Sequence, residues 1–84
     1  MRVLRNKWQN YFDLSDPETY RILAGVLQHE RRKSAVLFYE GVSWDPPTTK
    51  ILEERFQSLA PLADLNCARY SIGTGYAFIE FKLR

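Results

Sequence analysis

Cysteine and histidine are scarce in this sequence of 84 residues, and their scarcity limits the chemistry that we expect. Cys67 is the single cysteine, which excludes an internal disulfide and a cysteine-based metal cluster. His29 is the single histidine, which excludes a pair of histidine ligands on one metal. We therefore expect no metal, no cofactor and no enzymatic activity. Disulfides form in oxidising compartments, and this chain cannot form one internally, so we expect a cytoplasmic protein.

Long apolar runs and a large excess of one charge are also missing. No run approaches the roughly 20 apolar residues of a membrane-spanning helix, and none of signal-peptide length follows the basic N-terminus. We therefore expect no membrane partner. The 12 basic and 10 acidic side chains give a net charge of +2, which is too small to indicate a nucleic-acid partner by itself. With 45% apolar residues, residues 1–84 are expected to form one small globular domain.

Two Asp-Pro pairs predict the starts of two helices, because aspartate caps a helix and proline suits its first position. The first pair is Asp16-Pro17, and the second is Asp45-Pro46. The first helix is expected to end at residues 31–33, and Pro61 is expected to end the second. Gly25 lies inside the first helix, where a close approach of helix and sheet would explain it. The apolar stripes at helical spacing are Tyr20, Leu23, Ala24 and Leu27, widened by Ile22 and Val26, and then Ile51, Leu52, Phe56 and Leu59.

Four further segments show the patterns of strands. Alternation predicts a first strand at about residues 7–14, with Trp8, Asn10, Phe12 and Leu14 on one face. Residues 1–6 either extend a strand or fray. Residues 35–42 are apolar on both faces, as in a central strand. Residues 66–71 and 76–83 alternate on either side of a hairpin turn, Gly73-Thr74-Gly75.

The expected order is strand, helix, strand, helix, strand, strand. The first strand–helix–strand unit favours parallel pairing, and the last two strands favour an antiparallel hairpin. Two helices can cover only one face of such a sheet. The sequence therefore predicts an α/β two-layer sandwich, in which two helices pack on one face of a mixed four-stranded sheet.

Two short stretches resemble the TusA (SirA-like) family. The segment Asp45-Pro46-Pro47-Thr48-Thr49-Lys50 is similar to that family's Asp-Pro-Ala-Thr-Thr-Arg loop. Asp16-Pro17-Glu18 falls where the family has Cys-Pro-Glu-Pro at the start of its first helix. The resemblance implies a shared fold over roughly residues 8–83. In sulfur-carrying members that cysteine holds the persulfide, and Asp16 cannot, so the resemblance implies a relative without sulfur transfer.

Nucleic-acid binding is the alternative that other resemblances imply. The order of elements is shared with Alba-type proteins and with the C-terminal domain of a translation initiation factor. Residues 74–81 are similar to the aromatic octamer of RNA-recognition motifs, in which the residues at Tyr76 and Phe78 stack on bases. An RNA-recognition motif domain continues after this octamer with a helix and a strand. We therefore expect this segment to share with the motif only its two aromatic residues on a polar strand face.

The final strand contains the sequence's main candidate site. Ala77, Ile79, Phe81 and Leu83 form its apolar face, which leaves Tyr76 and Phe78 on the other side. A hairpin loop over Ile72–Gly75 would place Ser71 opposite Tyr76 and Arg69 opposite Phe78. The alternative is that the N-terminal residues or Trp8 fold over these aromatic rings. The partner-binding residues expected on the open sheet face are Arg69, Tyr76, Phe78 and Lys82.

We expect a non-enzymatic interaction module that binds a protein partner or a second copy of itself through this face. Binding of RNA or of another single strand is the alternative, and a place in a sulfur relay is the weakest hypothesis. A separate cluster of cations, Arg31, Arg32 and Lys33, could contact an anion but also suits the negative end of a helix.

Overall fold

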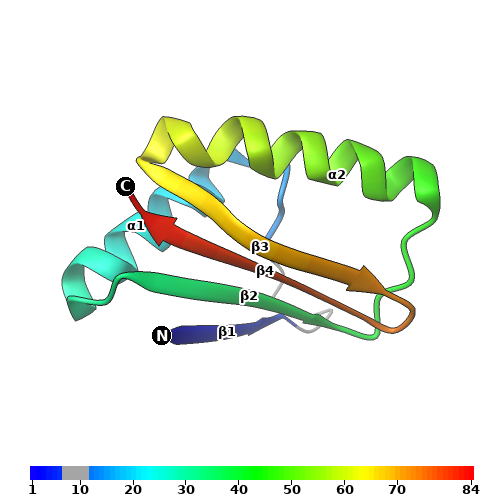
Figure 1. Ribbon diagram of the computed structural model, residues 1–84, viewed down its shortest axis with the longest axis horizontal. Helices are drawn as coiled ribbons and strands as arrows, with labels where there is room; N and C mark the ends of the chain where they lie inside the picture. Colours follow the sequence, from blue (N-terminus) through cyan, green and yellow to red (C-terminus); the bar gives the residue numbers. More distant parts are fainter. Residues whose placement is uncertain (7–11) are drawn as a thin grey trace.

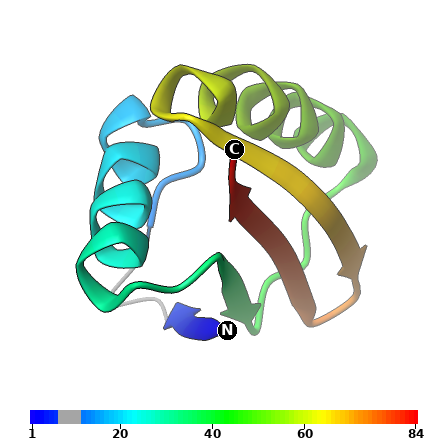
Figure 2. The same cartoon turned by 60° about the vertical axis from the view of Figure 1, so that its left-hand side comes forward.

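The computed structural model, which describes residues 1–6 and 12–84, has two helices and a four-stranded sheet (Figure 1). The strands lie side by side in the order β1-β2-β4-β3; β1 and β2 are parallel, and β4 is antiparallel to both of its neighbours. Figure 2 shows both helices on one side of the sheet. The predicted two-layer α/β sandwich is confirmed. The elements are β1 (Arg2–Asn6), α1 (Pro17–Glu30), β2 (Ser34–Glu40), α2 (Pro46–Leu59), the 3₁₀ turn η1 (Ala60–Ala63), β3 (Leu65–Gly73) and β4 (Tyr76–Leu83).

Both helices begin at the predicted Asp-Pro pairs. The Asp16 side chain accepts a hydrogen bond from the Glu18 backbone N–H at 2.9 Å. Asp45 does the same for the N–H of Thr48 at 2.8 Å. Hydrogen bonds from the Thr48 side chain and backbone lower the pKa of Asp45 below its ordinary value. Each cap satisfies a backbone donor that the first turn of a helix leaves unpaired.

The core lies between the helices and one face of the sheet. The predicted stripe of α1 is buried, and Phe56 of α2 is buried beside it. Phe81 of β4 meets two of these aromatic rings edge to face, Tyr20 at 5.6 Å and Phe56 at 6.2 Å between ring centroids. These aromatic contacts add to the apolar area buried and bind both helices to the same strand.

Two expectations about the helices are wrong. Ile22 is 43% exposed and Ile51 is 53% exposed, because the buried stripes are narrower than the full set of apolar residues. A Cβ added at Gly25 would meet nothing within 4 Å, so no close approach to the sheet explains this glycine. The expected end of the second helix is confirmed, because α2 finishes at Leu59 and Pro61 lies just beyond it in η1.

The first strand begins earlier than predicted. Residues 2–6 pair with β2 from Arg2 opposite Ala35 to Asn6 opposite Tyr39. Residues 7–11 of the predicted strand, with Trp8 and Asn10, lie outside the described residues, and residues 12–14 are not a strand. The buried Asn6 side chain accepts a hydrogen bond from the Phe12 N–H at 2.8 Å. Leu14 is buried from an irregular segment, so its alternation with Phe12 reflects core contacts rather than a strand.

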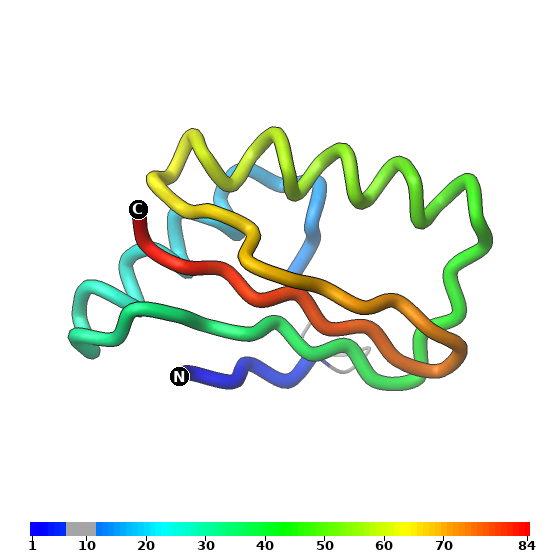
Figure 3. The backbone as a smooth tube through the Cα atoms, in the orientation of Figure 1, coloured from blue at the N-terminus to red at the C-terminus, as the bar shows by residue number. Residues whose placement is uncertain are grey.

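The hairpin between β3 and β4 is tighter than predicted. Gly73 pairs with Tyr76, so Thr74 and Gly75 alone form the loop. Gly75 has φ +86°, a conformation that glycine adopts without strain. Figure 3 shows the hairpin end beside the chain that leaves β2. There the Gly41 N–H donates to the Gly75 carbonyl and the Gly75 N–H donates to the Val42 carbonyl, both at 2.8 Å.

Candidate sheet-face binding site

The side of the sheet opposite the helices is called the open face here. On β4 the predicted alternation is confirmed: Ala77, Ile79 and Phe81 are fully buried against the helices, and the residues between them point the other way. The register of the strands places the following residues together on the open face: Val3, Arg5, Val36, Phe38, Glu40, Arg69, Ser71, Tyr76, Phe78, Glu80 and Lys82.

Two phenylalanines lie at the centre of the open face. Phe38 of β2 is directly opposite Phe78 of β4, and both are half-buried. The guanidinium carbon of Arg5 lies 5.6 Å from the centre of the Phe38 ring. The guanidinium carbon of Arg69 lies 5.9 Å from the centre of the Phe78 ring. Both distances are within the range of cation–π attraction, so each ring has an arginine beside it from an edge strand.

Each of these arginines also forms an ion pair. Arg5 Nη1 lies 2.7 Å from Glu40 Oε1, and Arg69 Nε lies 2.7 Å from Glu80 Oε1. Glu80 is only 7% exposed, so Arg69 supplies the charge that its buried carboxylate requires. We call these two groups the Arg5 cluster (Arg5, Phe38, Glu40) and the Arg69 cluster (Arg69, Phe78, Glu80).

The structure brings together two of the four predicted partner-binding residues, Arg69 and Phe78. It differs from the prediction in register, because the two-residue loop places Arg69 opposite Glu80 and Ser71 opposite Phe78. Lys82 is exposed at the far end of β4, about 13 Å along the strand from Phe78, and is not part of the Arg69 cluster.

Tyr76 is 40% exposed at the hairpin end of the open face. A Cβ added at Gly73 would lie 2.4 Å from the Tyr76 ring, so the ring covers that glycine across the strand pair. The Tyr76 hydroxyl lies 3.3 Å from Ser71 Oγ. Tyr76 therefore packs along the hairpin, where an aromatic ring over a strand glycine supports pairing.

The backbone of residues 2–6 does not fold over the aromatic rings, although the Arg5 side chain lies beside Phe38. Residues 2–6 form β1 and lie beside β2 in the plane of the sheet (Figure 1). Trp8, the other residue expected to fold over the rings, lies outside the described residues.

Four residues of the two clusters were missing from the predicted site: Arg5, Phe38, Glu40 and Glu80. Residues 35–42 are apolar on both faces, so the sequence alone does not indicate whether Phe38 lies on the helix side or on the open face. The position of Glu80 on the open face follows from alternation, but its partner depends on the register of β3. Arg5 could be placed only once β1 was known to be an edge strand next to β2.

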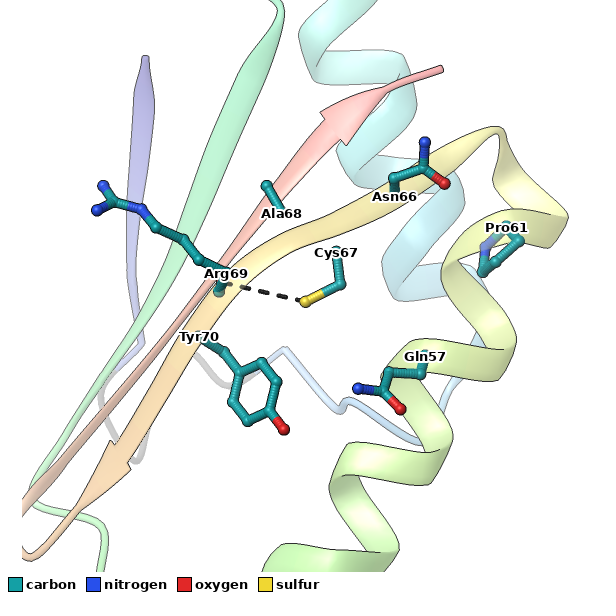
Figure 4. A pocket seen from close by; sticks show the side chains of 7 residues that line it. All are labelled: Gln57, Pro61, Asn66, Cys67, Ala68, Arg69 and Tyr70. Atoms are coloured by element: carbon teal, nitrogen blue, oxygen red, sulfur yellow. Dashed lines mark hydrogen bonds between the residues drawn. The ribbon is translucent and has the colours of Figure 1, made fainter.

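A β-bulge divides β3 into two parts. The register shifts between Cys67 and Arg69, which leaves Ala68 without a partner in the ladder. Figure 4 shows the result: Cys67 and Tyr70 point toward α2, and Arg69 points away from it. Cys67 was predicted to share a face with Arg69; the bulge moves it to the helix side. There it lines a groove of 570 Å³ with Gln57, Pro61, Asn66, Ala68, Arg69 and Tyr70.

The groove does not activate the thiol. Burial, and secondarily the charge of Glu80, raises the pKa of Cys67 above its ordinary value. Burial and then an interaction with Glu53 also raise the pKa of Tyr70. Because the thiolate is the nucleophilic form, a raised pKa leaves Cys67 protonated and weakly reactive at neutral pH.

The basic residues 31–33 follow the last turn of α1. Arg31 adopts a left-handed conformation with φ +54°, and its N–H donates to the Gln28 carbonyl. Arg32 Nε lies 3.1 Å from Glu30 Oε1, and Arg2 Nε lies 3.8 Å from Glu30 Oε2. Lys33 is exposed. Glu30 thus offsets part of the positive charge, and anion binding at this cluster stays a prediction.

No protein-family model matches the chain, and no curated protein matches it. The TusA-like relationship therefore stays a prediction from two short stretches of sequence. Within residues 1–6 and 12–84, no helix is long and apolar enough to cross a membrane. The same part of the chain contains no group of three or more His, Cys, Asp or Glu side chains that could hold a metal ion.

Proposed function

We propose that this protein is a non-enzymatic interaction module that binds a protein through the open face. The observation that supports the proposal is the half-exposed pair of Phe38 and Phe78, which lies outside the helix-covered core. The two inner strands of the open face hold Val36, Phe38 and Phe78 together with Glu40 and Glu80, and arginines lie on both edge strands. An apolar centre with a polar rim, in which aromatic residues and arginine are frequent, is typical of protein–protein interfaces.

The charges of the face favour a protein over a nucleic acid. Nucleic-acid binding depends on an excess of cations that replaces the counterions of the phosphates. Arg5 and Arg69 are already paired with Glu40 and Glu80, so the two clusters together have no net charge.

A sulfur-relay role receives no support from the two residues that it would need. Asp16 caps α1, and the thiol of Cys67 has a raised pKa. We predict that mass spectrometry after incubation with a persulfide donor shows only slow labelling at Cys67. A fast and stoichiometric adduct would show that Cys67 is a sulfur carrier.

The test of the proposed function compares two variants of the tagged full chain in a pull-down from cells. Phe78→Lys adds a charge to the centre of the open face, whereas Ile51→Lys makes a similar change at an exposed position on α2. We expect proteins captured by the wild type to be lost with Phe78→Lys and kept with Ile51→Lys. Circular dichroism is the control that checks whether both variants are folded.

A second assay tests the nucleic-acid alternative directly. Fluorescence anisotropy of a labelled single-stranded RNA is measured against the wild type and Phe78→Lys at low salt. We expect no saturable binding. RNA binding that Phe78→Lys changes would contradict the proposal and assign the face to nucleic acid instead.

A further inference from the structure

We infer that the occupant of the open face is a second copy of this chain, bound face to face as a weak symmetric dimer. The inference rests on the proposed function, because it uses the same face and names its partner. Three observations support it: the arrangement of the two clusters, their balanced charge, and the area that the face can bury.

The central side chains of the open face repeat after a half-turn about an axis normal to the sheet. Phe38 and Phe78 are directly opposite each other on antiparallel strands. Glu40 and Glu80 each lie two residues further along their own strand, so they fall on opposite sides of the phenylalanine pair. A second copy that faces this surface therefore presents a phenylalanine pair at the centre and a carboxylate on each side.

The balance of charge suits contact between identical surfaces. A symmetric dimer brings the same patch of both subunits together, so a patch of one sign would repel its own copy. The centre of the open face instead holds two arginines and two glutamates, each arginine 2.7 Å from its glutamate. Opposing copies can therefore meet unlike charges, whereas a partner of one strong sign finds no complementary excess here.

The guanidinium groups of the two ion pairs lie where a dimer can keep them hydrated. Arg5 and Arg69 project from the two edge strands and are 66% and 64% exposed as side chains. Val36, Phe38 and Phe78 lie on the two inner strands. Burying a charge costs free energy, so this division keeps the arginines at the rim of the contact, while Glu40 and Glu80 lie nearer its centre and Glu80 is already buried beside Arg69.

The size of the face predicts a transient dimer. Four strands about 4.8 Å apart and about 3.3 Å of rise per residue give a seven-residue sheet face of about 440 Å². Two such faces bury about 900 Å² in total, which is below the roughly 1,200 Å² of stable interfaces. The dimer is therefore weak and is populated only at high protein concentration.

Sedimentation velocity on the purified full chain, from about 10 µM to 1 mM, tests this inference. The wild type is expected to shift from monomer to dimer across this range. Arg5→Glu and Glu40→Arg change the charge of the face in opposite directions, so each variant alone repels its own copy. We expect each to associate at least tenfold more weakly than the wild type and an equimolar mixture of the two to recover association.

A matched pair of substitutions controls for net charge. Arg21 and Glu18 form an exposed ion pair on α1, away from the open face. Arg21→Glu and Glu18→Arg are expected to associate as the wild type does. Because Arg5 and Glu40 are partly exposed, their variants are expected to fold, which circular dichroism checks.

Three results would overturn the inference. The first is a wild type that stays monomeric at about 1 mM. The second is a dimer that is insensitive to both face variants, which would place the contact elsewhere. The third is an Arg5→Glu and Glu40→Arg mixture that stays monomeric. If the wild type is monomeric while Phe78→Lys still abolishes capture of a cellular protein, the dimer fails and the proposed function stands.

Discussion

The two faces of one sheet differ in what covers their aromatic side chains. On the helix side, Phe81 is fully buried and contacts the rings of Tyr20 and Phe56. On the open face, Phe78 is three residues away on the same strand, is only half-buried, and has the Arg69 guanidinium beside it. The same residue type in the same strand is thus packed by helices on one side and by a charged side chain on the other.

This difference follows from the number of helices that pack on the sheet. Two helices can cover one face of a four-stranded sheet, and the other face must be solvated or covered by something outside the fold. The open face limits its exposed apolar area with long arginine side chains, which lie against the rings and keep their charges accessible. Its aromatic residues therefore remain available to a partner without a large exposed apolar patch.

The largest expected effect separates the two faces directly. Phe81→Ala should destabilise the fold by about 3 to 5 kcal/mol, because it opens a cavity beside the rings of Tyr20 and Phe56. Phe78→Ala should cost about 1 kcal/mol, because it loses partly exposed area and one cation–π contact. Urea unfolding of both variants measures the difference. Equal losses of stability would mean that the open face is packed like the core.

The next effect compares the two ion pairs within the open face. Arg69 pairs with a carboxylate that is mostly buried, whereas Arg5 pairs with one that is 39% exposed as a side chain. A double-mutant cycle of Arg69→Ala and Glu80→Gln should give a coupling of about 1 kcal/mol, and Arg5→Ala with Glu40→Gln less than about 0.5 kcal/mol. The reverse order would show that exposure does not govern the strength of these pairs.

The last effect concerns two glycines. Gly25 is an exposed helix residue with free space around its missing side chain, so Gly25→Ala should stabilise the protein by about 0.5 to 1 kcal/mol. Gly73→Ala should destabilise it, because the new methyl group would collide with the Tyr76 ring. Thermal unfolding distinguishes the two. A loss of stability in Gly25→Ala would indicate that the outer side of α1 is in contact after all.

The sequence correctly predicted those helices and strands that are marked by a pattern of neighbouring residues. The Asp-Pro pairs located both helix starts, and alternation along residues 76–83 assigned the two faces of β4. The first strand was misplaced, because Phe12 and Leu14 contact the core from an irregular segment and imitate a strand pattern. Local alternation does not distinguish these two origins of burial.

The candidate site was only partly predictable, because its contacts depend on pairing between strands. Arg69 and Phe78 could be assigned to the open face from alternation. Their neighbours depend on the two-residue hairpin loop, which fixes Glu80 opposite Arg69. The bulge at Ala68 sends Cys67 to the helix side, and nothing in the alternation of residues 66–71 indicates it.

If Phe38 and Phe78 serve binding rather than the core, their loss should weaken association and leave the fold intact. Sedimentation velocity, with circular dichroism on the same samples, tests this claim in the double variant Phe38→Ser/Phe78→Ser. We expect a folded chain that unfolds cooperatively and associates at least tenfold more weakly than the wild type. A variant that fails to fold would show that both rings belong to the core. A folded variant that associates as tightly as the wild type would show that the open face is not the contact surface.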